Sequence, residues 1–151
     1  MEDLFAVRLR KERQKKRWSN RYLAESIGVN ENTYHHYEYG NCKPSLPKLI
    51  LLATQLNVSL DYLCGRSRAR RSFSLPPDAD IHQLLAENLK QLRQQTGLTQ
   101  KETALALDIH EHTYQYYEIQ KRLPTYQMFL QLADFYQIPV DRLIMVQANP
   151  S

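Results

Sequence analysis

Apolar residues along the chain recur every three or four positions, which is the period of an amphipathic helix, and strand-like alternation is scarce. In the first half, this spacing predicts five helices at approximately 3–17, 20–27, 31–39, 46–56 and 59–64. In the second half, it predicts five more at approximately 80–96, 100–107, 111–119, 126–136 and 140–146. We therefore expect an all-α chain.

Residues that cap helices stand at the predicted boundaries. N-cap residues precede four helices of the first half: Ser19, Asn30, Ser45 and Ser59. In the second half, Thr99 and Glu102 form a capping box in the stretch TQKE. Pro44 and Pro124 close the loop before the fourth helix of each half, so this helix boundary falls at the same position in both halves.

The chain contains two copies of one unit. A shift of 80 residues aligns the halves without a gap over about 60 positions, and places NENTYHHYEYGNCKP (30–44) on HEHTYQYYEIQKRLP (110–124). Matched positions include Leu9/Leu89, Arg13/Arg93, Ala24/Ala104, Leu52/Leu132, Asp61/Asp141 and Leu63/Leu143. Two units are too few for a solenoid, so each copy should have its own core.

The repeat defines the domain boundaries that we expect: an N-terminal domain at 1–65, a linker at 66–80 and a C-terminal domain at 81–151. The linker carries four arginines and the pair Pro76-Pro77, which cannot continue a helix. Its arginines either contact phosphates, as basic arms do, or only keep the linker soluble. A linker of roughly 15 residues reaches up to ~50 Å when extended.

Composition narrows the class of protein. The chain has 151 residues, 42% of them hydrophobic, and no window resembles a membrane span or a secretory signal. Its two cysteines, Cys42 and Cys64, lack the spacing of a zinc site or of a disulfide framework. We expect a cytoplasmic, nucleoid-associated protein without a cofactor or metal ion.

Charge is distributed unevenly between the copies. Residues 1–71 hold 14 Lys+Arg and 7 Asp+Glu, a net charge of +7, whereas residues 72–151 hold 6 and 9, a net charge of −3. A basic half suggests a polyanionic partner, although a basic helix face is often only solvated.

The second and third helices of each copy are short and separated by about three residues. Such a turn forces a steep crossing, which needs a small residue on its inner side, and Ala24 and Ala104 stand there. Val29 and Ile109 supply an apolar residue beneath the turn. This arrangement lets one helix enter a DNA major groove while the other spans the backbone.

The stretch NRYLAESIGVNENTYHHYEYG resembles the helix-turn-helix of the lambda-repressor-like, Cro and XRE family of bacterial and phage DNA-binding proteins. Copy one matches the family pattern at Trp18-Ser19-Asn20, Ala24, Ile27-Gly28-Val29, Thr33-Tyr34, Tyr37-Glu38-Tyr39-Gly40 and Pro44. Copy two matches it at Leu98-Thr99-Gln100, Ala104, Leu107, Ile109, Thr113-Tyr114, Tyr117-Glu118 and Pro124. The resemblance implies two tandem five-helix DNA-binding domains.

The resemblance further implies a sequence-specific regulator of transcription, most simply a repressor on a mobile element, with double-stranded DNA as partner. We expect no membrane partner, because no apolar window is long enough to span a bilayer, and no small-molecule ligand, because the repeats leave no separate ligand-sensing domain. Two alternatives stay open: an accessory factor that marks an origin, transfer or recombination site, and an adaptor whose C-terminal domain binds a protein partner or a second copy of the chain.

The third helix of each copy, at 31–39 and 111–119, is the one that would enter the major groove, and we call it the recognition helix. Helical periodicity gives each recognition helix an inner and an outer face. Tyr34 and Tyr37 face inward and belong to the core, although their hydroxyl groups could extend to DNA phosphates. The outward side chains, which are the candidates for reading bases, are Glu31, Asn32, His35 and His36 in copy one and Glu111, His112, Gln115 and Tyr116 in copy two.

Candidates for phosphate contact surround these helices. They start the second helix or follow the third: Asn20, Arg21, Asn41 and Lys43 in copy one, and Gln100, Lys101, Lys121 and Arg122 in copy two. Glu38 and Glu118 would repel phosphate, so we expect them to pair internally with Arg13 and Arg93.

Copy two departs from the pattern at two turns. Asp108 replaces Gly28 and Gln120 replaces Gly40, where a left-handed backbone is often needed. A residue other than glycine costs about 1 kcal/mol there. Together with its net negative charge, this predicts a weaker DNA reader or a surface used for protein contacts.

We expect no enzymatic activity. His35, His36, His110 and His112 lack a neighbouring nucleophile or orienting group in the sequence, and no glycine-rich phosphate loop is present.

Overall fold

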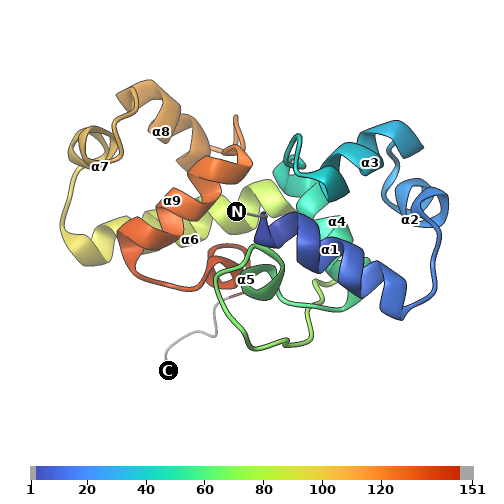
Figure 1. Ribbon diagram of the computed structural model, residues 1–151. Helices are drawn as coiled ribbons and strands as arrows, with labels where there is room; N and C mark the ends of the chain where they lie inside the picture. The colour runs from blue at the N-terminus through green and yellow to red at the C-terminus, as the bar shows by residue number, and fades with distance from the viewer. Residues whose placement is uncertain (1–2, 147–151) are drawn as a thin grey trace. The chain divides into compact units, whose positions relative to one another are not determined.

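The computed structural model describes residues 3–146, which contain helices and no strand. Contacts divide the chain between Ser74 and Leu75 into two compact units, so each is considered by itself (Figure 1). The all-α prediction with two tandem helical domains is confirmed. No helix within residues 3–146 is both long enough and apolar enough to cross a lipid bilayer.

The described part of the N-terminal unit, residues 3–74, has five helices around a leucine-rich core. They are α1 (Leu4–Lys15), α2 (Asn20–Ile27), α3 (Glu31–Tyr39), α4 (Leu46–Leu56) and α5 (Leu60–Leu63). Leu9, Leu23, Tyr34, Leu49 and Leu52, from four different helices, are completely buried. Burying such side chains stabilises a small domain by about 1.5–3 kcal/mol each, and here it fixes α2 and α3 against α1 and α4.

The C-terminal unit repeats this arrangement. Its elements are α6 (Ile81–Thr96), α7 (Gln100–Ala106), α8 (Glu111–Glu118), α9 (Tyr126–Tyr136) and the 3-10 helix η1 (Val140–Leu143). Leu89, Tyr114, Phe129 and Leu132 are buried and correspond in register to Leu9, Tyr34, Leu49 and Leu52. The 80-residue repeat in sequence is therefore a repeat in packing.

Several predicted helix boundaries are confirmed. The side chains of Ser19, Asn30 and Ser59 accept backbone hydrogen bonds as N-caps, whereas Ser45 occupies its N-cap position without one. The Thr99–Glu102 capping box has both of its hydrogen bonds. These caps satisfy backbone N–H groups that a helix start leaves without partners.

Two predicted elements differ from the structure. The first helix ends at Lys15 instead of residue 17, because Arg17 turns into the left-handed region at φ 59°. The last element is a short 3-10 helix that begins after Pro139, with Arg142 donating to the carbonyl of Pro139, three residues earlier. The matching element α5, also four residues long, is α-helical, with the Leu63 N–H bonded to the Ser59 carbonyl four residues earlier. The two copies therefore differ in the bonding of this last turn.

Candidate nucleic-acid interface

The turn between α2 and α3 is formed by a C-cap glycine and an N-cap asparagine. Gly28 ends α2 at φ 77°, and Asn30 then caps α3 with a 2.7 Å bond from the Thr33 N–H. The backbone N–H of Val29 donates to the carbonyl of Ala24, which is buried at the crossing. A left-handed glycine and an N-cap in succession turn the chain sharply enough for α3 to cross α2.

The α7–α8 turn has the same form with different residues. Asp108 takes the left-handed conformation of Gly28, at φ 59°, and Gln120 takes that of Gly40, at φ 67°. Ile109 N–H donates to Ala104 O, as Val29 does to Ala24, but the His110 side chain makes no cap hydrogen bond. The prediction of strained non-glycine turns in copy two is confirmed by these angles.

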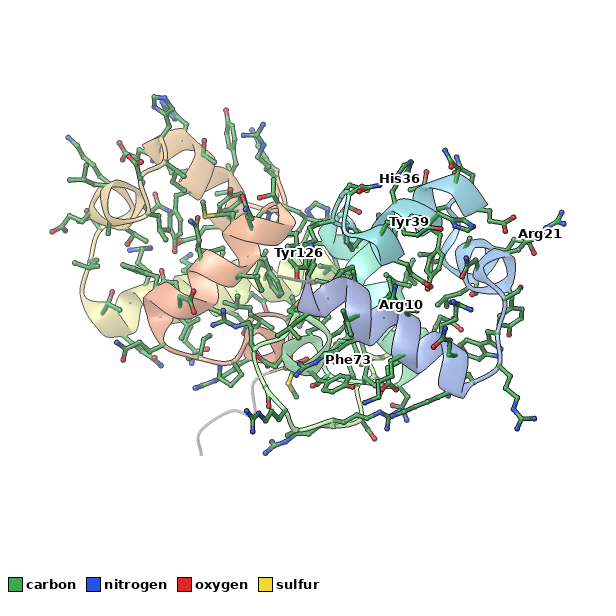
Figure 2. The ribbon with its side chains drawn as sticks, viewed as in Figure 1. Arg10, Arg21, His36, Tyr39, Phe73 and Tyr126 are labelled. Carbon is green, nitrogen blue, oxygen red and sulfur yellow. The ribbon has the colours of Figure 1, made fainter. Side chains whose placement is uncertain are left out.

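On α3, the four candidate base readers lie on the side of the helix away from the core. Glu31, Asn32 and His36 are exposed and His35 is half-buried. His35 Nε2 lies 3.2 Å from Asn20 Nδ2 and 3.7 Å from Glu31 Oε1, while His36 Nδ1 lies 3.1 Å from Asn41 Nδ2. Figure 2 shows His36 pointing outward from α3. Asn32 therefore combines exposure with an amide suited to adenine.

On α8, the corresponding four side chains are less uniformly exposed. His112 and Tyr116 are exposed, whereas Glu111 and Gln115 are half-buried. Gln115 Nε2 donates to Glu111 Oε1 at 3.3 Å, and Lys121 Nζ lies 5.9 Å from the centre of the Tyr116 ring. These side chains share one face, but two of them are engaged with each other.

The tyrosines assigned to the core are buried as predicted. Tyr34 and Tyr37 pack edge-to-face with ring centres 6.3 Å apart, and Tyr114 and Tyr117 do the same at 6.2 Å. The suggestion that the hydroxyls reach DNA is wrong for Tyr34, whose oxygen is buried without a hydrogen-bond partner in residues 3–146. Burial raises the pKa of this phenol, so Tyr34 stays neutral.

The phosphate candidates of the N-terminal unit have different surroundings. Arg21 and Asn41 are exposed, and Arg21 Nε lies 3.3 Å from Glu25 Oε1 (Figure 2). Asn20 is half-buried as the first residue of α2. Half-buried Lys43 forms an ion pair with Asp3, the N-cap of α1, and its ammonium lies 5.5 Å from the Phe5 ring centre.

In the C-terminal unit, Lys101, Lys121 and Arg122 are exposed after or beside the recognition helix. Gln100 instead points inward: its Nε2 donates to Glu118 Oε1 at 3.1 Å. Asn20, at the matching position, contacts His35, so the two copies use this residue differently.

The two expected internal ion pairs are present. Arg13 Nε lies 2.6 Å from Glu38 Oε2, and Arg93 Nε lies 2.8 Å from Glu118 Oε2, each with a second bond through Nη2. Burial alone raises the pKa of Glu118, but hydrogen bonds from Arg93, Gln100 and Tyr114 outweigh it, and the pKa lies below its usual range. Each pair joins the first helix of its unit to the recognition helix, which orients that helix.

Two residues beside the candidate N-terminal interface were not identified as site residues from the sequence. Tyr39 is 69% exposed, and its ring centre lies 5.9 Å from that of His35 (Figure 2). Its place four residues after His35 is a helical-period signal that could have found it. Lys48, from α4, donates to the Ile27 carbonyl at 2.8 Å and caps the end of α2. A contact across 21 residues has no local signal.

Comparisons with known proteins agree with this geometry. A family model described as Helix-turn-helix matches the chain twice, over residues 9–63 and 89–143, at the same 80-residue shift as the repeat. The chain is similar to the HTH-type transcriptional regulator AnsR of Bacillus subtilis (strain 168), at 38% identity over 65 residues, which cover 43% of this chain and 56% of AnsR.

The chain is also similar to the cryptic phage CTXphi transcriptional repressor RstR of Vibrio cholerae, at 30% identity over 86 residues, which cover 57% of this chain and 68% of RstR. The uncharacterized HTH-type transcriptional regulator YobD of Bacillus subtilis (strain 168) is 39% identical over 62 residues, covering 41% of this chain and 55% of YobD. The chain thus spans little more than half the length of AnsR and of YobD. No solved structure matches it significantly.

Proposed function

This chain belongs to the lambda-repressor-like (XRE) helix-turn-helix family of DNA-binding transcription regulators, and we propose that it is a sequence-specific repressor that reads two successive major grooves of double-stranded DNA. The observation that carries the proposal is the presence of two helix-turn-helix pairs in one chain, α2–α3 and α7–α8, each with hydrogen-bonding side chains on the outer face of its second helix.

In the N-terminal unit, the outward side chains match the chemistry of base edges. Asn32 presents an amide that can bond bidentately to adenine, and Glu31 can accept from the amino group of cytosine. Arg21, Asn41 and Lys43 then contact phosphates on either side, with Lys43 exchanging Asp3 for a phosphate oxygen. The net charge of +7 over residues 1–71 supports attraction to the duplex.

In the C-terminal unit, Gln115 reads adenine and His112 contacts a neighbouring base, while Lys101, Lys121 and Arg122 contact phosphate. Gln115 must first release Glu111, and Gln100 is held by Glu118 instead of facing outward. We therefore assign this unit the weaker share of the affinity. Because the two outer faces carry different residues, the two half-sites differ and the operator is not a true palindrome.

Repression follows most simply from occupancy of the DNA. Within residues 3–146, both units are helix-turn-helix units, and this part of the chain offers no separate domain for sensing a ligand. RstR, with which the chain aligns over 86 residues, is named a phage transcriptional repressor. Occupancy of a promoter by both units would exclude polymerase without a further activity.

In-vitro selection from random duplex DNA with the full chain tests the proposal. We expect two different half-sites whose centres lie about one helical turn, ~34 Å, apart. Selection of no sequence would refute specific DNA binding, and selection of one half-site would refute the two-groove arrangement. A genomic footprint over promoters supports repression, whereas one over origins or recombination sites supports the accessory-factor alternative.

One observation favours an adaptor role for the C-terminal unit as the second candidate. Leu105 on α7 is 81% exposed and Ile119 at the end of α8 is 53% exposed, in a unit of net negative charge. Exposed apolar side chains mark a protein contact when they form one contiguous patch, which is what the adaptor role requires of these two. A protein that co-purifies with the full chain, but not with the Leu105→Ser variant, supports this role if DNA binding is unchanged.

A further inference from the structure

The first half of the segment between the two units is folded onto the N-terminal unit. Gly65, at φ 80°, turns the chain so closely past Leu4 that a Cβ at this position would lie 2.9 Å from Leu4 Cβ. Arg8 on α1 then donates to the Ser67 carbonyl at 2.8 Å and also to the Tyr62 carbonyl. We call residues 66–73 the strap.

Further along, the strap is bound at two more points. Arg70 lies 2.8 Å from Glu12 Oε1 through Nε and 2.7 Å through Nη2. Phe73 is buried, and its N–H donates to Asn57 Oδ1, at the end of α4, at 3.2 Å. In the view of Figure 2, Phe73 lies below α1, whereas His36 on α3 lies above it. The strap is therefore attached away from the recognition helix.

Glu12 makes the Arg70 contact specific. Its side chain is fully buried in α1, where it also accepts from the Tyr62 hydroxyl at 3.1 Å and from Lys15. Burial raises the pKa of this carboxyl, but hydrogen bonds from Arg70, Tyr62 and Lys15, together with the charge of Arg70, outweigh that effect and lower the pKa. If Arg70 left, this buried carboxylate would lose its two shortest bonds to a cation and would rely on Lys15 at 3.3 Å, which is unfavourable, so Glu12 favours the docked strap.

The C-terminal unit lacks these groups. Leu92 and Arg142 stand where Glu12 and Tyr62 stand in the N-terminal unit, and Asn88 replaces Arg8. Asn88 Nδ2 donates to the carbonyls of Leu143 and Met145, so this position holds the chain after the fifth element in both copies. Within residues 3–146, a buried carboxylate bound to an arginine of the segment after the fifth helix is thus present in copy one, and leucine occupies its position in copy two.

We propose that the strap sets the length of the tether between the two DNA-reading units, with Glu12, Arg70 and Phe73 as residues that determine the permitted spacing of half-sites; this inference rests on the proposed function. With the strap docked, the tether runs from Phe73 to Asp80, which is the N-cap of α6. These seven residue steps span at most ~25 Å. With Arg70 and Phe73 detached, the tether would begin at Ser67, which Arg8 still holds, and reach ~45 Å.

The bond from the Ala79 N–H to the Pro76 carbonyl, at 2.9 Å, forms a turn that shortens the remaining tether further. A docked strap thus restricts the separations that the two units can bridge on one duplex. The difference of ~20 Å between the docked and the released tether corresponds to about 6 base pairs at 3.4 Å per pair.

The test compares the full chain with a released and a matched control variant. Arg70→Ser/Phe73→Ser removes both attachments, and Glu12→Leu/Arg70→Ser/Phe73→Ser also removes the buried carboxylate, using the residue that copy two has at this position. Arg71→Ser is the control, because Arg71 is exposed and its loss changes the charge as Arg70→Ser does. Circular dichroism verifies that every variant is folded.

Two readouts separate strap docking from DNA binding. Trypsin cleavage after Arg68, measured without DNA, should accelerate about tenfold or more in the released variants and remain unchanged in Arg71→Ser. In-vitro selection should give one narrow half-site spacing for the natural chain and for Arg71→Ser, and spacings up to about 6 base pairs longer for the released variants.

Unchanged cleavage in the released variants would show that the strap is not held as proposed. Faster cleavage with an unchanged spacing would show that the strap does not set the reach. If the natural chain selects no paired half-sites, the proposed function fails and the spacing role fails with it, while the cleavage rates still report on docking.

Discussion

At the scale of single residues, the two copies place similar side chains in different situations. Asn32 is exposed on α3 with its amide turned away from the core, whereas Gln115 on α8 donates to Glu111. Asn20 contacts a candidate base reader, whereas Gln100 contacts the buried Glu118. These local partners support the proposal that α3 is the better prepared reader, since among residues 3–146 no hydrogen bond to the Asn32 amide has to break before it meets a base.

Replacing Asn32 with alanine should therefore weaken binding to the selected site by about 1–3 kcal/mol and relax specificity at one base pair, because a bidentate amide contact is lost. Fluorescence anisotropy with the selected duplex and its single-base variants measures both effects. Gln14→Ala, an exposed change on α1, is the control and should leave both unchanged. An unaltered base preference in Asn32→Ala would show that α3 is not the reading helix.

The buried ion pair predicts a pH dependence of stability. The pKa of Glu118 is lowered in the folded state, so its contribution is complete above the unfolded value of about 4.3 and is lost as the pH falls through the folded value. Glu118→Gln should cost about 1–3 kcal/mol at neutral pH, and this difference should shrink below about pH 4. Urea unfolding at several pH values measures it.

The exposed Glu87 on α6 provides the comparison for this change, since Glu87→Gln alters charge without a buried partner. It should leave the free energy of unfolding nearly unchanged throughout the same pH range. A cost in Glu118→Gln that stayed constant down to acidic pH would mean that the ion pair is not the source of the effect.

At the scale of elements, the helix ends distinguish the copies more than the helices do. α3 ends at Gly40 with φ 78°, and α8 is followed by Gln120 with φ 67°. α2 ends at Gly28 and receives the Lys48 cap, whereas Asp108 and Met128 occupy the matching positions of copy two. The same turns form in both copies because burial of the helices on either side compensates for the strain of a left-handed non-glycine residue.

This strain can be relieved by one substitution. Gln120→Gly should stabilise the C-terminal unit by about 1 kcal/mol, because glycine adopts a positive φ without a steric cost. Gln127→Gly, an exposed position inside α9, should destabilise it by about 1 kcal/mol. Thermal unfolding of the full chain measures both, and opposite signs are the expected outcome. Equal shifts in one direction would contradict the assignment of strain to Gln120.

At the scale of the whole molecule, the two units differ in net charge. The net charge is +7 over residues 1–71 and −3 over residues 72–151, so counterion release from DNA should come mainly from the N-terminal unit. Part of its positive charge is committed internally, since Arg13, Arg70 and Lys43 face Glu38, Glu12 and Asp3.

Lys43→Ala should reduce the slope of log affinity against log salt by about 1 and weaken all sequences alike, because a phosphate contact is lost without a base contact. Lys121→Ala, in the matching loop of the weaker unit, should change the slope less. Binding titrations between 50 and 200 mM salt compare the two. A larger effect from Lys121 would assign the stronger phosphate contacts to copy two.

The sequence by itself determined the all-α fold, the repeat, most of the caps and the inward side of each recognition helix. These features depend on spacings within about one helical turn or on a shift of the chain against itself. It also supported the Arg13–Glu38 and Arg93–Glu118 pairs, since the charges recur together at both copies.

Only the tertiary structure decided which polar groups meet across long stretches of chain. Arg70 and Glu12 are 58 residues apart, and Lys48 and Ile27 are 21 residues apart, so no local sequence pattern predicts either contact. A basic, proline-containing segment predicts a free linker, but burial of Phe73 and the desolvated Glu12 carboxylate fold half of it onto the N-terminal unit. The periodic positions of side chains were therefore readable from the sequence, whereas their partners depended on how the helices pack.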